Sequence, residues 1–180
     1  MEDEKKTKVQ SAIIGSAGEH LVISLLLRRN FIAGLAPQNT EDFDIVVMSK
    51  DGQTLFPVQV KTSTKKSWML SKKHENAIKN LIYVFVRFSD DMTGSEIFIM
   101  KSNKVSEVTK LSHQIWLKIP SKGGKVHQDS DIRNLMMDST SLIKNLSDPK
   151  KYLTQIELDF IDSHKLGWIE KYRDSWDIFK

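Results

Sequence analysis

Two apolar segments of the sequence contain three polar side chains of the types that bind divalent metal ions and activate water. Asp44 precedes Ile-Val-Val-Met, and Gln59 and Lys61 alternate with valines in Val-Gln-Val-Lys-Thr. Mg²⁺ and Mn²⁺ prefer hard oxygen ligands, and they lower the pKa of a bound water. A nearby lysine can position the resulting hydroxide or stabilise developing negative charge. These residue types indicate phosphodiester hydrolysis, with Lys61 and metal-bound water as the reactive pair.

A β-hairpin is the element that would bring these side chains together. Residues 43–48 and 54–62 are rich in β-branched and apolar residues, and Ser-Lys-Asp-Gly-Gln lies between them. Asp-Gly between such runs is a strong hairpin signal, because a type I′ turn needs positive φ at both central residues. We therefore expect the chain to turn about Asp51 and Gly52.

The simplest two-residue turn fixes the register of this hairpin. Paired residues then have numbers that add up to 103, so Asp44 faces Gln59. Directly opposed residues project from the same face, and Lys61 shares that face through the two-residue period. Pro57 falls opposite Val46, and a proline inside a strand indicates an edge position or a bulge. A bulge would slip the register by one residue and send Asp44 to the other face.

A helix over residues 11–30 precedes the hairpin and carries Glu19. Its apolar residues recur at spacings of three and four, which is typical of a helix with one buried stripe. A glutamate within a helix is usually solvated, which is one interpretation of Glu19. Leu21 and Val22 beside it, and Gly18, which would let the sheet approach closely, favour a place for Glu19 in the site.

The rest of the chain is expected to form a mixture of helices and strands. Residues 31–35 fit a short strand or a turn, and the further expectations are a helix at 71–80, a strand at 81–88, a strand at 95–100, a helix at 105–111, a strand at 114–119 and a mostly helical region at 131–180. This order predicts an α/β (α+β) fold with a mixed sheet. We expect a charged tail at 1–10, a core domain at 11–120 and a helical extension at 121–180 packed on the core.

Composition narrows the classes of protein. The 180 residues carry a net charge of +4 and no cysteine, which excludes disulfides and thiolate metal sites. The five histidines show no zinc-ligand spacing. The charged start lacks the apolar core of a signal peptide, and no apolar run approaches the roughly 18 residues that span a bilayer. A cytoplasmic protein without a membrane partner is the expectation.

Positive charge gathers directly after the suspected site. Thr62 is followed by Lys65 and Lys66, and then by Trp68. An aromatic ring among cations is typical of proteins that bind single-stranded nucleic acid, so we expect Thr62, Lys65, Lys66 and Trp68 to contact nucleic acid. The alternatives are a solvated lysine-rich loop and a tryptophan that anchors the core.

Three segments together resemble a known group of nucleases. Gly-Ser-Ala-Gly-Glu at residues 15–19, Phe-Asp-Ile-Val-Val at 43–47 and Val-Gln-Val-Lys-Thr at 58–62 resemble the motifs of the PD-(D/E)XK nuclease superfamily. The closest likeness is to the branch with Q-x-K in the third motif, as in Mrr-type restriction endonucleases. The resemblance covers about residues 11–100 and implies a restriction-endonuclease-like αβββαβ core with a mixed central sheet.

The resemblance also implies roles for single residues. Asp44 would be the central metal ligand, Gln59 would stand at the usual acidic position, and Lys61 would be the catalytic lysine. Glu19 would bind or orient a metal, and the backbone carbonyl of Val60 would serve as a further ligand. Two features depart from the pattern: no proline precedes Asp44, and Gln59 removes one negative charge.

Three hypotheses follow. The first is Mg²⁺- or Mn²⁺-dependent hydrolysis of DNA phosphodiester bonds by an endonuclease or resolvase-like enzyme, with a homodimer as an open alternative to a monomer. The second is a catalytically weak or inactive module with the nuclease fold that binds nucleic acid or a protein partner. The third is a structural or interaction domain whose tryptophan-bearing C-terminal part docks a partner.

Overall fold

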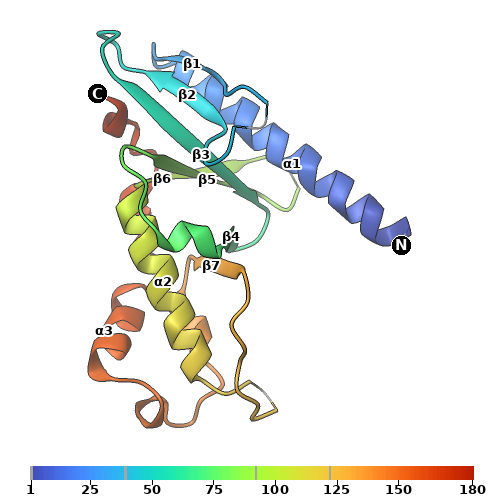
Figure 1. Ribbon diagram of the computed structural model, residues 1–180, viewed down its shortest axis with the longest axis vertical. Helices are drawn as coiled ribbons and strands as arrows, with labels where there is room; N and C mark the ends of the chain where they lie inside the picture. Colours follow the sequence, from blue (N-terminus) through green and yellow to red (C-terminus); the bar gives the residue numbers. More distant parts are fainter. Residues whose placement is uncertain (1, 39, 92, 122) are drawn as a thin grey trace. The chain divides into compact units, whose positions relative to one another are not determined.

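The computed structural model describes residues 2–38, 40–91, 93–121 and 123–180, and the chain forms two compact units (Figure 1). Unit 1 comprises Met1–Lys65, Ile78–Ser102 and Tyr172–Lys180, and unit 2 comprises Lys66–Ala77 and Asn103–Lys171. The two units interleave along the chain. This differs from the linear divisions after residues 10 and 120 that the sequence pattern predicted.

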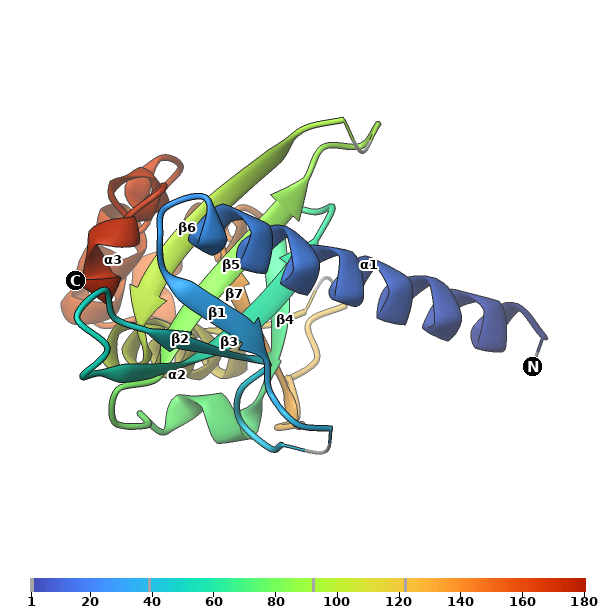
Figure 2. The same cartoon turned by 90° about the horizontal axis from the view of Figure 1, so that it is seen from above.

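Unit 1 is a helix laid against a five-stranded sheet (Figures 1 and 2). Its elements are α1 (Glu2–Leu27), β1 (Ile32–Leu35), β2 (Ile45–Met48), β3 (Leu55–Ser63), β5 (Ile82–Phe88), β6 (Ser95–Lys101) and the 3₁₀ turn η5 (Trp176–Phe179). The strand order is β1-β2-β3-β5-β6, and only β3 and β5 run parallel. The predicted α+β class with a mixed sheet is confirmed.

One apolar core holds the helix on this sheet. Val22 and Leu26 of α1 are fully buried. They belong to one cluster with the inward-facing residues of the sheet and with Trp176 and Phe179 near the C-terminus. Full burial of each such side chain contributes about 1.5–3 kcal/mol. The core therefore fixes the C-terminal half of α1, where the buried Gly18 immediately precedes Glu19.

The hairpin has the predicted register, but the predicted type I′ turn about Asp51 and Gly52 is wrong. Asp51 does not have a positive φ, and the backbone N–H of Gly52 donates to the Ser49 carbonyl at 2.9 Å, so the chain turns over residues 49–52 instead. Gly52 has a φ of 74°, and the pairs Val46–Pro57 and Met48–Leu55 add up to 103, as expected. Pro57 is tolerated because its missing N–H faces away from β2, and the pairing of β3 with β5 starts only at Val58.

Unit 2 contains a two-stranded antiparallel sheet of β4 (Ser67–Ser71) and β7 (Ile132–Met136). Its other elements are the helices α2 (Ser102–Lys118, whose first residue lies in unit 1) and α3 (Gln155–Ser163) and the 3₁₀ turns η1 (Lys72–Glu75), η2 (Ser139–Leu142), η3 (Pro149–Lys151) and η4 (Trp168–Tyr172, which ends at the boundary with unit 1). The sequence pattern indicated neither strand of this sheet.

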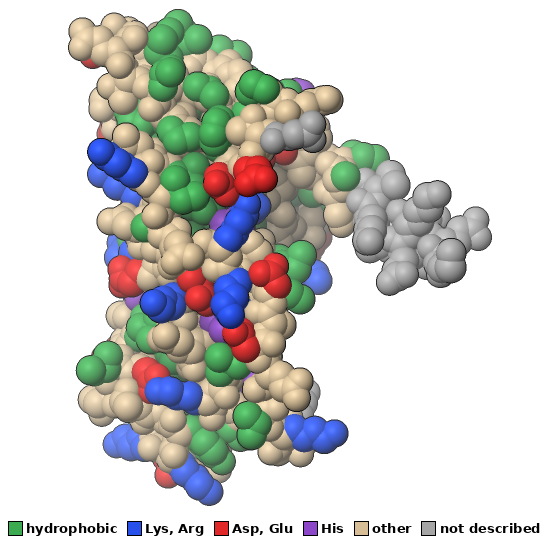
Figure 3. All heavy atoms as spheres, viewed as in Figure 1, with side chains coloured by type: hydrophobic (Ala, Val, Ile, Leu, Met, Phe, Trp, Pro, Cys, Tyr) green, Lys and Arg blue, Asp and Glu red, His purple; other side chains and the backbone are tan. Residues whose placement is uncertain are grey.

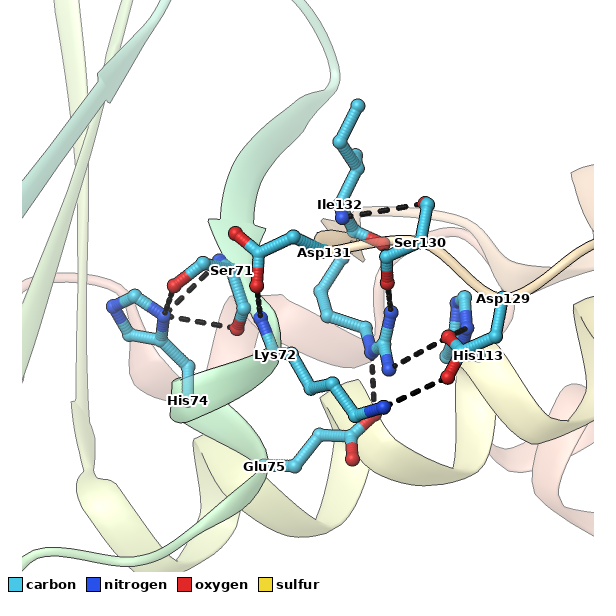
Figure 4. A network of polar contacts seen from close by, with 10 residues as sticks. Ser71, Lys72, His74, Glu75, His113, Asp129, Ser130, Asp131 and Ile132 are labelled. Atoms are coloured by element: carbon cyan, nitrogen blue, oxygen red, sulfur yellow. Dashed lines mark hydrogen bonds and ion pairs between the residues drawn. The ribbon is translucent and has the colours of Figure 1, made fainter.

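A buried cation organises this small sheet. The guanidinium of Arg133 is 2% exposed, and it pairs with the carboxylates of Glu75 and, at 3.1 Å, Asp129. Asp129 also accepts from Lys72 Nζ at 2.8 Å and pairs with His113 Nε2 at 2.9 Å (Figure 4). The hydrogen bonds from Lys72 and His113 hold the pKa of Asp129 well below its usual range. These partners compensate the free-energy cost of removing the charge of Arg133 from water.

Several predicted elements are corrected. The helix expected from residue 11 begins at Glu2, so the charged tail at 1–10 is helical from residue 2 onward. The helix expected at 71–80 is the short 3₁₀ turn η1, and the strand expected at 114–119 lies almost wholly in α2. The region 131–180 begins with a strand, β7, whose inward position is taken by Arg133. Because this inward position holds a charged residue, the alternation of apolar and polar residues that indicates a strand was not visible in the sequence.

The apolar character of α1 also exceeds the expectation. By length and composition alone, its window Gln10–Leu27 is apolar enough to cross a membrane, with a mean hydropathy of 1.3. The expectation that no apolar run approaches 18 residues is therefore wrong. A mostly buried core helix and a signal sequence near the N-terminus pass the same test. Only 17% of this window is buried, and its buried residues include Val22 and Leu26, which pack in the core of unit 1.

Candidate active site

A β-bulge sets the position of Asp44 at the start of β2. Val58 is the register partner of Ile45, yet the backbone N–H of Asp44 also donates to the Val58 carbonyl at 2.8 Å. Two successive residues therefore oppose one, which is the arrangement of a β-bulge. The bulge that the proline suggested is present, but it lies at Asp44 itself and not at Pro57.

The carboxylate of Asp44 still reaches the predicted partner. Its Oδ2 accepts a hydrogen bond from Gln59 Nε2 and another from the backbone N–H of Val60 at 2.7 Å. The Val60 N–H points to the side where β2 has ended, so the carboxylate takes the place that a backbone carbonyl fills elsewhere in the sheet. The predicted meeting of Asp44 and Gln59 is thus found. Two donors fix the orientation of this carboxylate.

Gly18 brings the helix close to β3 beside this pair. A Cβ built on Gly18 would lie 2.0 Å from Thr62 Oγ1 and 3.1 Å from Thr62 Cβ. No real side chain fits there, so the close approach of α1 and β3 requires glycine. The expectation that Gly18 admits the sheet is confirmed, and the approach places Glu19, the next residue, at the rim of the site.

The charges of Asp44 and Lys61 both act on Glu19. Partial burial raises the pKa of the Glu19 carboxyl, and the negative charge of Asp44 raises it further. The positive charges of His20 and Lys61 act in the opposite direction. Asp44 and Lys61 therefore both lie close enough to Glu19 to affect its ionisation, and Gln59 is hydrogen-bonded to Asp44. All four predicted site residues therefore belong to one neighbourhood of unit 1.

The donor set fits a hard divalent cation in its chemistry. Two carboxylates that repel each other, with an amide beside them, are oxygen donors of the type that Mg²⁺ and Mn²⁺ prefer. The amide of Gln59 donates to Asp44 here, and a half-turn would present its oxygen instead. Within residues 2–38, 40–91, 93–121 and 123–180, no group of three or more His, Cys, Asp or Glu side chains could hold a metal ion.

Tyr83 is a neighbour of the site that the sequence did not reveal. It lies opposite Gln59 in the parallel pairing of β3 and β5, and it is almost fully buried. Burial, and then the negative charge of Asp42, raise the pKa of Tyr83 to about 12. The hydroxyl thus stays protonated, and it is hydrogen-bonded to the side chain of Ser102. A hydroxyl in an otherwise apolar strand was the available signal.

The residues expected to contact nucleic acid lie in different settings. Thr62 packs against Gly18, and Lys65 is exposed just after β3 in unit 1. Lys66 is exposed in unit 2. Trp68 is fully buried in β4 opposite Leu135, so its expected role as a stacking platform is wrong. The strand alternation directs Trp68 inward and leaves Met69 exposed.

Comparisons with known proteins find likeness in structure only. No protein-family model matches the chain, and no curated protein matches it. The bacterial homing endonuclease I-Ssp6803I superposes with a TM-score of 0.47 at 9% identity, covering 93% of this chain and 88% of that one. The Holliday junction resolvase Hjc of Archaeoglobus fulgidus superposes with a TM-score of 0.41 at 13% identity, covering 80% of this chain and 93% of that one. Likeness at this level leaves the function to be argued from the site.

Proposed function

We propose that this protein hydrolyses DNA phosphodiester bonds in a metal-dependent reaction, as an endonuclease or resolvase-like enzyme. The observation that carries the proposal is the meeting of Asp44 and Gln59, from the two strands of one hairpin, within the electrostatic reach of Glu19 and Lys61. Carboxylates, an amide and an ammonium in one place match the donors and the positive charge that phosphodiester hydrolysis requires.

Each residue has a role in this proposal. Asp44, Glu19 and the amide oxygen of Gln59 would hold Mg²⁺ or Mn²⁺, which supplies Lewis acidity toward the phosphate when it is bound. Asp44 is pre-oriented by the Val60 N–H, so little reorganisation is needed. The ammonium of Lys61 would stabilise the charge that develops on the phosphate oxygens. The exposed Lys65 and Lys66 would attract the DNA backbone.

A plasmid-nicking assay tests the proposal. Supercoiled plasmid is incubated with Mg²⁺ or Mn²⁺ and with the wild type, Lys61→Ala or Asp44→Asn. We expect either substitution to reduce nicking by about 10²–10³-fold, because each removes charge from the reacting centre. Asp44→Asn is preferred to Asp44→Ala because the amide oxygen can still accept from Val60. Lys79→Ala, at an exposed position of unit 1, is the matched control. A Lys61→Ala protein that nicks at the wild-type rate would exclude this mechanism.

A second candidate is a nucleic-acid-binding module that retains the scaffold without catalysis. The observation in its favour is that Gln59 donates to Asp44 and leaves the described site with two carboxylates. This candidate predicts salt-sensitive DNA affinity without cleavage in any divalent metal. Titration calorimetry with Mg²⁺ and Mn²⁺ separates the two, and Gln59→Glu should increase metal affinity only if the site holds the ion as proposed.

A further inference from the structure

Unit 2 contains a cavity of about 410 Å³ that is bounded by α2, β7 and η2. Ligand-binding pockets in proteins usually have volumes of about 300–1,000 Å³. The walls of this cavity come mainly from Ser112, His113 and Trp116 of α2 and from Ile132, Asn134 and Met136 of β7. None of the residues that line it is a lysine, arginine, aspartate or glutamate. The lining therefore suits a small neutral ligand.

The hydroxyl of Ser112 is a buried polar group without a partner. The side chain is 4% exposed, and among the described residues no atom forms a hydrogen bond with its Oγ. A serine within a helix commonly bonds to the carbonyl four residues earlier, and buried hydroxyls are almost always hydrogen-bonded. Because Ser112 lines the cavity, a ligand bound there would supply the missing partner.

Alternate residues of β7 turn their backbone groups away from β4. The N–H of Lys72 donates to the Asp131 carbonyl at 2.8 Å, and the N–H of Met137 donates to the Lys66 carbonyl at 3.0 Å. The odd-numbered residues of β7 therefore bond to β4, and the N–H and C=O groups of residues 132, 134 and 136 point to the free edge. These are the residues of β7 that line the cavity, and no described residue of β4 lines it. The cavity thus lies beside the free edge of β7.

Side chains cap this edge on both sides of Asn134. The N–H of Ile132 donates to Ser130 Oγ at 3.3 Å (Figure 4), and the carbonyl of Met136 accepts from Trp168 Nε1 at 3.1 Å. Within the part of the chain that the structure describes, the outward N–H and C=O of Asn134 have no such cap. A strand added to this edge would bond to alternate residues along it, and the caps prevent this. What remains is one donor and one acceptor, side by side, for a small ligand.

The surroundings of this donor and acceptor favour a ring without charge. The Trp116 ring in the cavity wall stacks on the rings of His127 and His113, with centroids 3.9 and 5.3 Å away. These contacts hold the apolar wall in place before a ligand binds. The nearby charges are paired, as Asp129 is with Lys72 at 2.8 Å, and Figure 3 shows acidic and basic side chains beside one another around η1 and β7. Locally balanced charge favours a neutral ligand over an ion.

We propose that this cavity binds a single nucleobase. A nucleobase is planar and uncharged, and its base-pairing edge carries a hydrogen-bond donor next to an acceptor. These two atoms match the adjacent C=O and N–H of Asn134, and the Ser112 hydroxyl meets a further polar atom of the base. The base belongs either to a free nucleoside or to an unpaired nucleotide of a strand, because in a duplex this edge is already occupied. The proposal is independent of hydrolysis at Asp44, and it is tested without a divalent metal.

Titration calorimetry of the full chain with nucleosides, in the presence of a chelator, tests the binding. Adenosine and cytidine each carry an amine next to a ring nitrogen that accepts a hydrogen bond. We expect at least one of the two to bind saturably, with one molecule per chain. The same nucleoside without its amine should bind about tenfold more weakly, because one hydrogen bond is lost. No saturable binding of either nucleoside, or equal binding without the amine, would overturn the proposal.

Two substitutions on α2 test the place of the ligand. Ser112→Ala and Thr109→Val each remove a buried hydroxyl that has no partner among the described residues, but only Ser112 lines the cavity. We expect Ser112→Ala to weaken nucleoside binding by about tenfold and the matched control Thr109→Val to leave it unchanged. Circular dichroism checks that both variants are folded. A Ser112→Ala protein that binds as the wild type does would overturn the proposed site.

A proline at position 134 tests the backbone donor. Asn134→Pro removes an N–H that does not bond to β4, and an edge strand tolerates proline at such a position. Asn134→Ala is the matched control, because it removes the side chain and keeps the N–H. We expect the proline variant to bind the nucleoside about tenfold more weakly than the alanine variant. A folded proline variant that binds as tightly as the alanine variant would refute the role of the edge.

Oligonucleotides distinguish the two sources of the base. If the base belongs to a strand, a short single strand of DNA should bind more tightly than the nucleoside and should lose this advantage in Ser112→Ala. If the ligand is a free nucleoside, the nucleoside should bind more tightly than the strand, again with dependence on Ser112. A blunt duplex that displaces the nucleoside as effectively as the single strand does would contradict the proposal, because its base-pairing edges are occupied.

Discussion

Replacing Gly18 by alanine should destabilise unit 1, although alanine is the better helix former. Alanine in a helix interior is favoured over glycine by about 1 kcal/mol. At this position, however, the new Cβ would lie 2.0 Å from Thr62 Oγ1 and 3.1 Å from Thr62 Cβ. Overpacking of this kind costs about 1–3 kcal/mol, because helix and sheet must separate. The overpacking cost less the gain in helix propensity leaves a net loss of up to about 2 kcal/mol in the free energy of unfolding.

Denaturant unfolding followed by circular dichroism measures this loss, and two further variants identify its cause. Gly15→Ala lies on the same helix with nothing described within 4 Å of its Cβ, so it should gain up to about 1 kcal/mol. Thr62→Ala in the Gly18→Ala background removes the atom closest to the new Cβ and should restore most of the lost stability. The two substitutions should therefore show a coupling free energy in a double-mutant cycle. A Gly18→Ala protein as stable as the Gly15→Ala protein would refute the close approach of α1 and β3.

The remaining predictions concern charge and burial. The raised pKa of Glu19 means that the folded state binds this proton more tightly than the unfolded state does. Stability should therefore fall as the pH rises from about 4.5 through the raised pKa. Glu19→Gln should flatten this dependence when the free energy of unfolding is measured against pH. Trp68→Ala should destabilise unit 2 by about 3–5 kcal/mol, whereas Met69→Ala should change stability by less than about 0.5 kcal/mol; equal effects in thermal unfolding would contradict the inward position of the tryptophan. Arg133→Met should cost about 3–5 kcal/mol because it leaves carboxylates without their partner, and Lys72→Met, at an exposed pair, about 0–1 kcal/mol; denaturant titration distinguishes these values.

The hairpin and its site could be predicted from neighbouring residues. The register that brings Asp44 to Gln59 was predicted correctly although its type I′ turn did not form, and the glycine before Glu19 indicated a close approach of the helix. These features depend on turn geometry, strand alternation and side-chain volume, all of which are encoded in short stretches of chain. The bulge was only an open alternative, because the local sequence pattern does not determine at which position of the hairpin a bulge forms.

Only the tertiary structure decided what depends on partners distant in the sequence. Trp68 stands among lysines and looked like an exposed ring, but β7 covers it from a segment more than sixty residues away. Arg133 is buried because Glu75, 58 positions earlier, neutralises it. The burial of a residue depends on which strand lies beside it, and local periodicity does not specify that strand. The sequence by itself thus determined the chemistry of Asp44, Gln59, Lys61 and Glu19, and the packed structure decided which of the surrounding side chains are available to a substrate.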